Sequence, residues 1–289
     1  MPPRRLRLDA ELVRRGLARS REQAAELIAG GRVSVAGAVA TKPATGVTTD
    51  AAIVVADDPD RPDYVSRGGH KLAGALDVFG PAGLEVARRR CLDAGASTGG
   101  FTDVLLRRGA REVVAVDVGY GQLAWSLQSD DRVDVRDRQN VREITADMIG
   151  GPVDLVVGDL SFISLTLVLD ALLGVMASDG DLALMVKPQF EVGKERVGKG
   201  GVVRDPALRA EAVATVAAEA ARRGWGARMV TRSPLPGPSG NVEFFLWLRR
   251  GPAEITDADI EEAVAETAQT PSPVQEDPGS SVPDERLPQ

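Results

Sequence analysis

Two lysines and two acidic residues stand where an α/β protein would carry out chemistry. Lys187 and Asp159 each follow an apolar segment that predicts a buried strand. Both therefore lie at the carboxyl ends of strands, the edge of an open α/β sheet where ligands bind. Lys71 heads a predicted helix, and Glu243 begins the last predicted strand. We interpret these four side chains as a candidate catalytic constellation, to be tested by their mutual distances.

The use of lysine supports a chemical role for Lys187. The chain has only five lysines, and its other basic residues are arginines. Arginine keeps its proton near neutral pH, whereas burial or a neighbouring cation allows a lysine to lose one. An ordinary lysine with a pKa of about 10.4 is neutral in about one molecule in 2,500 at pH 7. We predict that Lys187 is a general base; an ordinary surface lysine is the alternative interpretation.

A glycine-rich segment, residues 93–101, follows one predicted strand and opens a helix. Its glycines predict a tight turn that a nucleotide-like ligand can approach closely. The spacing differs from G-x-G-x-x-G, and the acid at its start would repel a pyrophosphate but suit a ligand with an ammonium group. A generic turn between strand and helix is the alternative. The candidate ligand-binding residues here are Asp93, Gly95, Ser97, Thr98, Gly99 and Gly100.

Acids after the next two strands indicate a nucleoside ligand. Asp117 ends the strand that follows the glycine-rich segment, where Rossmann-like proteins place an acid on a ribose diol. Asp137 and Asn140 follow a short strand at 133–135 and are predicted to contact an adenine edge. An exposed loop is the alternative for these last two residues.

Two groups of elements would position these residues. Residues 1–60 contain helices at 9–16 and 20–29, the second with a Ser20 capping box, and strands near 33–35 and 53–55. We expect a small α+β domain there and a linker at 61–66. Beyond it strands and helices alternate, which predicts a mostly parallel, doubly wound α/β sheet over 67–250. The predicted segments are 91–94, 102–108, 112–117, 154–157, 163–176, 182–186, 206–223, 228–231 and 242–248.

The last two strands flank a turn rich in proline and glycine, so they are expected to pair antiparallel at the edge of the sheet. Such an ending favours a methyltransferase over a dehydrogenase. The acidic tail at 251–289 is expected to hold one short helix around 260–265 and to be disordered beyond about residue 270.

Charge and composition limit the classes of function. Residues 251–289 hold ten acidic residues against one arginine, so of the formal charge of -7 this tail carries -9 and the rest carries +2. Residues 1–43 carry +5, the expected footprint of a module that meets phosphates. One cysteine and one histidine exclude an internal disulfide and a Cys/His metal site. With no apolar run of bilayer length, we expect a cytoplasmic protein without membrane contact.

In these same residues the chain resembles the TlyA family, bacterial rRNA 2'-O-methyltransferases in which an S4-type RNA-binding domain precedes an FtsJ-like methyltransferase domain. The resemblance implies a catalytic tetrad of Lys71, Asp159, Lys187 and Glu243, and places Phe162 beside a bound S-adenosylmethionine. It runs from about residue 4 to 250 through residues 9–28 with 42–43, 66–72, 91–101, 116–125, 159–164, 187–193 and 234–245.

The resemblance also implies a substrate, cytidines of 16S and 23S rRNA within ribosomal subunits. The extended start at residues 4–7 is similar to the longer, dual-substrate members. The linker departs from their R-x-W-V motif, with Tyr64 before Val65. A non-catalytic RNA-binding or assembly factor is the alternative function; a nucleotide-dependent oxidoreductase and a membrane-active toxin fit the sequence less well. The predicted RNA-binding residues are Arg5, Arg7, Arg19, Arg21 and Lys42.

Overall fold

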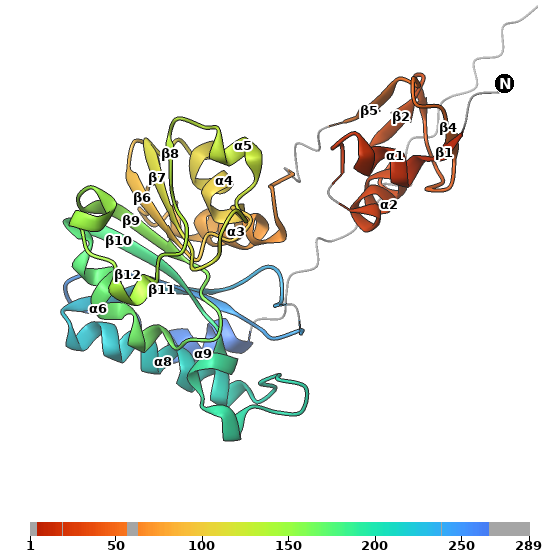
Figure 1. Ribbon diagram of the computed structural model, residues 1–289. Helices are drawn as coiled ribbons and strands as arrows, with labels where there is room; N and C mark the ends of the chain where they lie inside the picture. Colours follow the sequence, from red (N-terminus) through yellow and green to blue (C-terminus); the bar gives the residue numbers. More distant parts are fainter. Residues whose placement is uncertain (1–4, 19, 57–62, 238, 266–289) are drawn as a thin grey trace, which may run out of the picture. The chain divides into compact units, whose positions relative to one another are not determined.

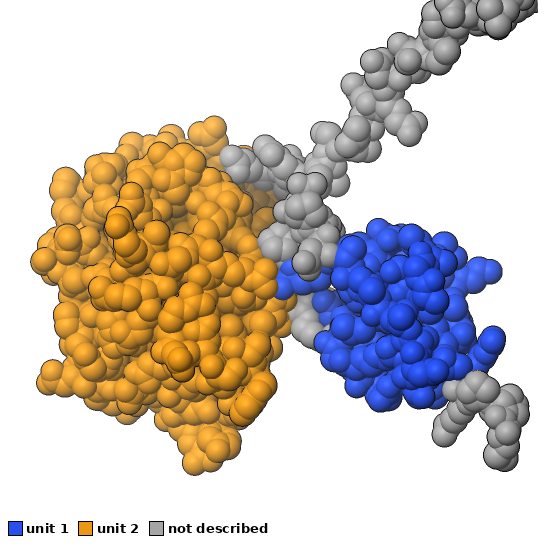
Figure 2. All heavy atoms as spheres, turned by 90° about the horizontal axis from the view of Figure 1, so that it is seen from above, with its two compact units in different colours: residues 1–63 blue, residues 64–289 orange. Residues whose placement is uncertain are grey.

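The computed structural model describes residues 5–18, 20–56, 63–237 and 239–265. The chain divides into two compact units, Met1–Asp63 and Tyr64–Gln289, coloured separately in Figure 2. We call them the N-terminal unit and the catalytic unit. Of the linker predicted at 61–66, residues 61–62 lie outside the described residues, and residues 63–66 are described.

The N-terminal unit packs two helices against short strands. Ser20 caps the second helix as predicted, since its Oγ accepts a hydrogen bond from the Gln23 amide at 3.1 Å. Leu8, Leu12 and Ile28 form its core. The pair β1·β4 was not predicted, because strands of two residues leave no periodic pattern. The elements are β1 Leu6–Arg7, α1 Leu8–Arg14, α2 Arg21–Ala29, β2 Val33–Val35, β3 Ala38–Val39, β4 Gly46–Val47 and β5 Ile53–Val55.

A sheet forms the centre of the catalytic unit (Figure 1). Among the described residues it has seven strands in the order β11-β12-β10-β9-β6-β7-β8. The expected antiparallel pair is present: β12 runs antiparallel to both of its neighbours, and β11 forms the edge. The strands are β6 Arg90–Ala94, β7 Glu112–Val116, β8 Val133–Arg136, β9 Val153–Gly158, β10 Met176–Val186, β11 Trp225–Arg232 and β12 Phe244–Arg250.

Helices cover both faces of this sheet, because its central strands are apolar on both sides. Leu92 and Val156 face one core, while their neighbours Cys91 and Leu155 face the other. One core lies against α3 (Arg67–Phe79) and α4 (Gly100–Arg107), and the other against α6 (Leu169–Gly174), α8 (Pro206–Arg222) and α9 (Asp257–Ala265). The remaining helices are α5 Trp125–Gln128, α7 Pro188–Glu191, η1 Val141–Glu143, η2 Asp147–Ile149, η3 Leu165–Leu167 and η4 Lys194–Arg196.

The prediction of one helix over 163–176 was wrong. A distant carboxylate, Glu191, accepts hydrogen bonds from the Leu165 amide at 2.8 Å and the Ser164 hydroxyl at 2.5 Å. Ser164 stays extended, so η3 and α6 replace a single helix. Strand β10 also begins earlier than predicted, at Met176, with an irregular register before Asp181. Both differences depend on contacts between distant parts of the chain.

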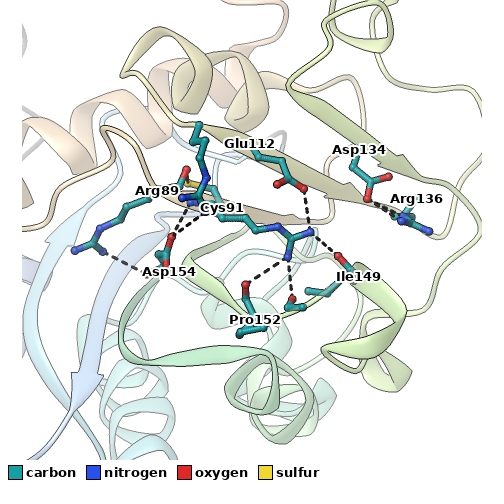
Figure 3. A network of polar contacts seen from close by, with 11 residues as sticks. Arg89, Cys91, Glu112, Asp134, Arg136, Ile149, Pro152 and Asp154 are labelled. Atoms are coloured by element: carbon teal, nitrogen blue, oxygen red, sulfur yellow. Dashed lines mark hydrogen bonds and ion pairs between the residues drawn. The ribbon is translucent and has the colours of Figure 1, made fainter.

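Polar contacts tie the amino-terminal edge of the sheet together, as Figure 3 shows. Arg90, the first residue of β6, donates its amide to Asp154 at 2.8 Å and its guanidinium to Glu112 at 2.9 Å. The same guanidinium donates to the carbonyls of Ile149 and Gly151. This edge is therefore occupied by structural contacts, and the opposite edge is left for a site.

The chain after β12 continues onto the catalytic unit. The Glu254 amide donates to the Ala227 carbonyl at 2.8 Å, and α9 packs on α8 and β11. The predicted disorder of the later tail falls on residues 266–289, which lie outside the described residues. Within the described part of the chain, no helix has the length and apolarity needed to cross a membrane.

Candidate active site

Lys187 and Asp159 form an ion pair at the carboxyl edge of the sheet. Asp159 directly follows β9, and Lys187 directly follows β10. The Lys187 Nζ lies 2.5 Å from the Asp159 Oδ1 and donates a hydrogen bond to the Ser161 Oγ at 2.9 Å. Lys187 is buried and Asp159 is partly buried. The lysine is therefore held by two oxygens from one loop.

Lys71 and Glu243 form a second pair. Their Nζ and Oε2 atoms are 2.5 Å apart, and both side chains are buried. Lys71 lies in the second turn of α3 and not at its head, because the helix already begins at Arg67. Glu243 immediately precedes β12, which begins at Phe244 and not at residue 242 as predicted. The contact joins a helix and a strand that are far apart in the sequence.

The register of the sheet brings both pairs to one edge. Val186, the last residue of β10, is paired with Phe244, the first residue of β12. Lys187 and Glu243 are the next residues of these antiparallel strands, so they leave the sheet side by side. Asp159 leaves β9, the neighbour of β10 on the other side. The four predicted residues are thus gathered on three adjacent strands and one covering helix.

Phe162 lies on the loop that carries Asp159. Its side chain is 91% exposed, its backbone has a φ of +64°, and its ring centre is 5.3 Å from that of Phe190. A positive φ is costly for an aromatic residue, so the loop must be held from outside. The bonds of Glu191 to the end of this loop supply that restraint.

Sequence reasoning missed Ser161 and Glu191. Both lie in the segments that carry the resemblance, 159–164 and 187–193, so their position was available as a signal. Their hydrogen-bond partners could not be predicted from the sequence. The sequence around a hydroxyl or a carboxylate does not show which donor or acceptor the fold will bring to it.

The glycine-rich segment joins β6 to α4, as predicted, but its glycines are required for a different reason. A Cβ on Gly95 would lie 2.9 Å from the Asp159 carbonyl oxygen, and the φ of Gly95 is +87°. A side chain on Gly99 would collide with Leu123 and Leu127, and the φ of Gly99 is +99°. Packing within the protein therefore requires both glycines by itself.

Gly100 makes a close contact between two helices. A Cβ on Gly100 would approach the Gly69 amide at 2.7 Å and collide with the Ser66 hydroxyl. The start of α4 therefore touches the start of α3, which carries Lys71. Ser97 and Thr98 are the exposed residues of the segment, and Ser97 has a positive φ of +49°.

Asp93 is a fully buried acid at the end of β6. Its Oδ2 accepts hydrogen bonds from the Thr102 amide at 2.9 Å and the Thr102 hydroxyl at 2.7 Å. Its Oδ1 has no hydrogen-bond partner among the described residues. Burial raises the pKa of Asp93 to about 7, and the nearby Asp159 and Asp117 add to this rise while Thr102 opposes it. Such an acid is suited to a cationic partner.

Asp117 and Asp137 organise the loops after β7 and β8. Asp117 accepts hydrogen bonds from the amides of Ser97 at 2.8 Å and Gly119 at 2.7 Å. Asp137 accepts one from the Gly121 amide at 2.8 Å. Asn140 is exposed and uses its side-chain carbonyl to cap η1. Asp117 thus lies beside the glycine-rich segment, whereas no contact of Asp137 or Asn140 points to a ligand.

The predicted RNA-binding side chains of the N-terminal unit are on its surface. Arg5, Arg7, Arg21 and Lys42 are all exposed. Arg19 lies outside the described residues.

Comparisons with known proteins agree in two parts of the chain. The model of the FtsJ-like methyltransferase family matches residues 64–250, and that of the S4 domain matches residues 6–53. The 16S/23S rRNA (cytidine-2'-O)-methyltransferase TlyA of Mycobacterium tuberculosis is 63% identical over 246 residues, which are 85% of this chain and 90% of that protein.

Two further relatives cover the chain to a similar extent. YqxC of Bacillus subtilis is 43% identical over 249 residues, 86% of this chain and 87% of its own. The solved structure of a hemolysin-named protein from Streptococcus thermophilus is 37% identical, with a TM-score of 0.68, over 91% of this chain and 95% of that one.

Proposed function

The chain belongs to the TlyA family of FtsJ-like methyltransferases that carry an S4 domain, and from this premise we propose that it methylates the ribose 2'-hydroxyl of rRNA cytidines. S-adenosylmethionine is the methyl donor. The observation that carries the proposal is the meeting of two lysine–carboxylate pairs at one sheet edge, beside the segment that begins at Asp93. A methyl transfer to a hydroxyl needs a base at such a place.

The residues around the glycine-rich segment fit S-adenosylmethionine. Asp93 has a buried carboxylate oxygen without a hydrogen-bond partner, which suits the positive charge of this ligand. Asp117, at the end of the next strand, suits the ribose hydroxyls. Ser97 and Thr98 present polar, exposed groups between them. We assign these residues, the glycines Gly95, Gly99 and Gly100, and Phe162 to the cofactor site, together with the less supported Asp137 and Asn140.

In the reaction, Lys187 first releases to solvent the proton that its ammonium holds in the ion pair with Asp159, and its neutral amine then accepts the proton of the 2'-hydroxyl. S-adenosylmethionine supplies a methyl group on a positively charged sulfur, so the hydroxyl oxygen must become a better nucleophile as its proton leaves. Asp159 and Ser161 hold the Lys187 amine in place from one side. Because the amine is held on that side, its orientation toward a substrate is restricted, and positioning of this kind contributes directly to rate.

Lys71 and Glu243 are the other two charged residues at the carboxyl edge of the sheet. The pair is buried, and Glu243 leaves its strand beside Lys187. Taking such a pair out of water costs free energy that the mutual attraction offsets only in part. We infer that the pair serves the site more than the stability of the fold, with the Lys71 ammonium placed to meet a group of the RNA substrate that enters the site.

The proposed substrate is 16S and 23S rRNA within ribosomal subunits, and the proposed location is therefore the cytoplasm. The M. tuberculosis relative is named for both rRNAs. The S4 domain supports RNA binding, and the exposed Arg5, Arg7, Arg21 and Lys42 are the proposed phosphate contacts, with Arg19 added from the sequence. Tyr64, where the family motif has tryptophan, is buried on α3 beside Gly69.

The proposal is tested by methyl transfer to isolated ribosomal subunits. Small and large subunits from cells that lack this protein are incubated with it and labelled S-adenosylmethionine, and nucleoside mass spectrometry identifies the product. We expect 2'-O-methylcytidine in both subunits. A Lys187→Ala variant should produce none, while the exposed Lys199→Ala should retain turnover at saturating subunits. Binding of subunits without any methylation would instead favour the non-catalytic assembly factor.

A further inference from the structure

The N-terminal unit contains two buried acids next to its exposed arginines. Asp9 is 3% exposed and Glu11 is 0% exposed, although both lie on the short surface helix α1. Fully buried acids are rare unless they are paired. Each of these two is bonded to two arginines, so each sits inside a small charged cluster.

Asp9 joins two arginines from different elements. Arg7 ends β1 and places its Nε 3.0 Å from the Asp9 Oδ1 and its Nη2 2.9 Å from the Oδ2. Arg21 begins α2 and donates its Nη2 to the same Oδ2 at 2.9 Å, with its Nε at 3.3 Å. The Ala10 amide also donates to Oδ1, at 2.8 Å. These contacts lower the pKa of Asp9, Arg7 being the largest cause, so the acid stays ionised.

The two arginines nevertheless face solvent. Their side chains are 51% and 60% exposed for Arg7 and Arg21. Both bind Asp9 through Nε and Nη2, so the Nη1 donors of each guanidinium are not used in these bonds. A guanidinium held along one edge keeps its other donors in a fixed direction, which suits a phosphate.

The turn that carries Lys42 meets the same end of α1. The Asp9 amide donates to the Pro43 carbonyl at 3.0 Å, and the Leu8 amide donates to the Thr45 carbonyl at 2.8 Å. Lys42 itself is exposed. Three cations from separate elements are thus tied to the surroundings of one buried carboxylate.

Glu11 forms the second charged cluster of α1, and its contacts are structural. It binds Arg14 and Arg15, and the Arg15 guanidinium also donates to the carbonyls of Ala51 and Thr49. Its cluster therefore fastens α1 to the segment before β5. Within the described part of the chain, the arginines of the Asp9 cluster donate to no backbone carbonyl of this kind, and their side chains are exposed to solvent.

We propose that Asp9 is a positioning residue for RNA: it holds Arg7 and Arg21 as one rigid phosphate-binding pair, at the cost of one unit of positive charge. The inference rests on the proposed function, that this unit binds rRNA. Asp9 has two opposing effects on RNA affinity: it fixes the arginine side chains, which favours binding, and it removes one unit of positive charge, which disfavours binding. Free arginine side chains lose rotamer freedom when they bind, and a pair already fixed by a buried acid loses less.

A role of Asp9 through its charge alone and a role in positioning the arginines predict opposite changes in subunit affinity for Asp9→Asn. If only charge matters, the variant gains one positive charge and binds ribosomal subunits more tightly, as the matched variant Glu22→Gln, on an exposed neighbour of Arg21, should do. If Asp9 positions the arginines, Asp9→Asn should bind subunits on the order of tenfold more weakly, with a shallower salt dependence. Its affinity for an unstructured homopolymer RNA should be unchanged or higher.

A second variant distinguishes loss of positioning from loss of folding. Arg21→Lys keeps the charge at an exposed position but cannot make the two-atom contact with Asp9, so it should show the same loss of subunit affinity without unfolding. S-adenosylmethionine affinity, which reports on the catalytic unit alone, should stay at the wild-type level in both variants. Wild-type subunit affinity in Arg21→Lys, or in a folded Asp9→Asn, would overturn the inference.

The double variant Arg7→Gln/Arg21→Gln separates this inference from the proposed function. If it binds subunits poorly while Arg21→Lys and Asp9→Asn bind normally, the arginines act by charge alone and the positioning role is wrong. If the double variant also binds normally, the N-terminal unit does not hold rRNA through these residues, and that part of the proposed function is wrong instead.

Discussion

The two units use pairs of opposite charge in different ways. In the Asp9 cluster of the N-terminal unit the acid is buried and the cation is exposed, as with Asp9 and Arg21. At the candidate site of the catalytic unit the cation is buried as well, as with Lys71 and Glu243. An exposed arginine can attract a polyanion from solution, whereas a buried lysine can meet only a group that enters its site. Under the proposed function, the burial of the cation thus separates charge used for attraction from charge used in chemistry.

Residue type follows the same division. The exposed cations of the N-terminal unit are mostly arginines, which keep their charge at all relevant pH values. The buried cations at the sheet edge are lysines, whose nitrogen can act as a base once it has lost its proton. A change of residue type should therefore be harmful at the sheet edge even where charge is kept.

The largest expected effect comes from Lys187→Arg, which tests that statement directly. Arginine keeps the positive charge but does not accept a proton near neutral pH, so methylation should fall by about 100- to 10,000-fold. Single-turnover kinetics on ribosomal subunits measures the change, with subunit and cofactor binding as controls. Near wild-type methylation would show that Lys187 acts by charge and not as the base.

Breaking the buried pair Lys71·Glu243 should cost stability. Glu243→Gln leaves a buried ammonium without its ionised partner, and the free energy of unfolding should fall by about 3 kcal/mol. The double variant Lys71→Met/Glu243→Gln removes the unpaired charge, so most of this stability should return without activity. Denaturant titrations measure both effects. An equally unstable double variant would mean that packing, rather than the unpaired charge, caused the loss.

The binding of S-adenosylmethionine should depend on pH through Asp93. Because the pKa of Asp93 is raised to about 7, the acid is protonated below that pH, and a cationic ligand must displace the proton. Affinity should be constant above pH 7 and fall by up to about tenfold per pH unit below it. Calorimetry at pH values from about 5.5 to 8.5 measures this dependence of the affinity on pH. Asp93→Asn should bind more weakly and lose the dependence; the same slope in that variant would assign it to another group.

The smallest effects are expected from single exposed cations of the N-terminal unit. Arg5→Gln or Lys42→Gln should weaken subunit binding several-fold at physiological salt and reduce its salt dependence by about one phosphate contact each. Turnover at saturating subunits should not change, since these residues are proposed to act in RNA binding and not in the chemical step. Binding assays at several salt concentrations check this. A variant that lowered turnover at saturation would contradict the separation of attraction from chemistry.

Local patterns were enough to predict much of the fold. The alternation of apolar strands and helices predicted the sheet, and Ser20 predicted the start of α2. The strand-end positions of Asp159 and Lys187 predicted the edge at which they meet. These features depend on periodicity and capping, which act over a few residues.

Other features depended on contacts across the chain. The helix expected over 163–176 is divided because Glu191 takes the amide of Leu165. The packing of the protein by itself already requires Gly95 and Gly99, because a side chain there would meet Asp159, Leu123 or Leu127. The short pair β1·β4 exists because α1 and the turn at 43–45 bring it together.

The sequence by itself determined the family, the order of the two units and the residue types at the site, because these follow from motifs and local periodicity. Only the tertiary structure decided which lysine pairs with which acid, and that Asp9 lies beneath Arg7 and Arg21. Pairing and burial arise when distant segments pack together, and their energies depend on distance and exclusion of water, which no spacing along the chain encodes.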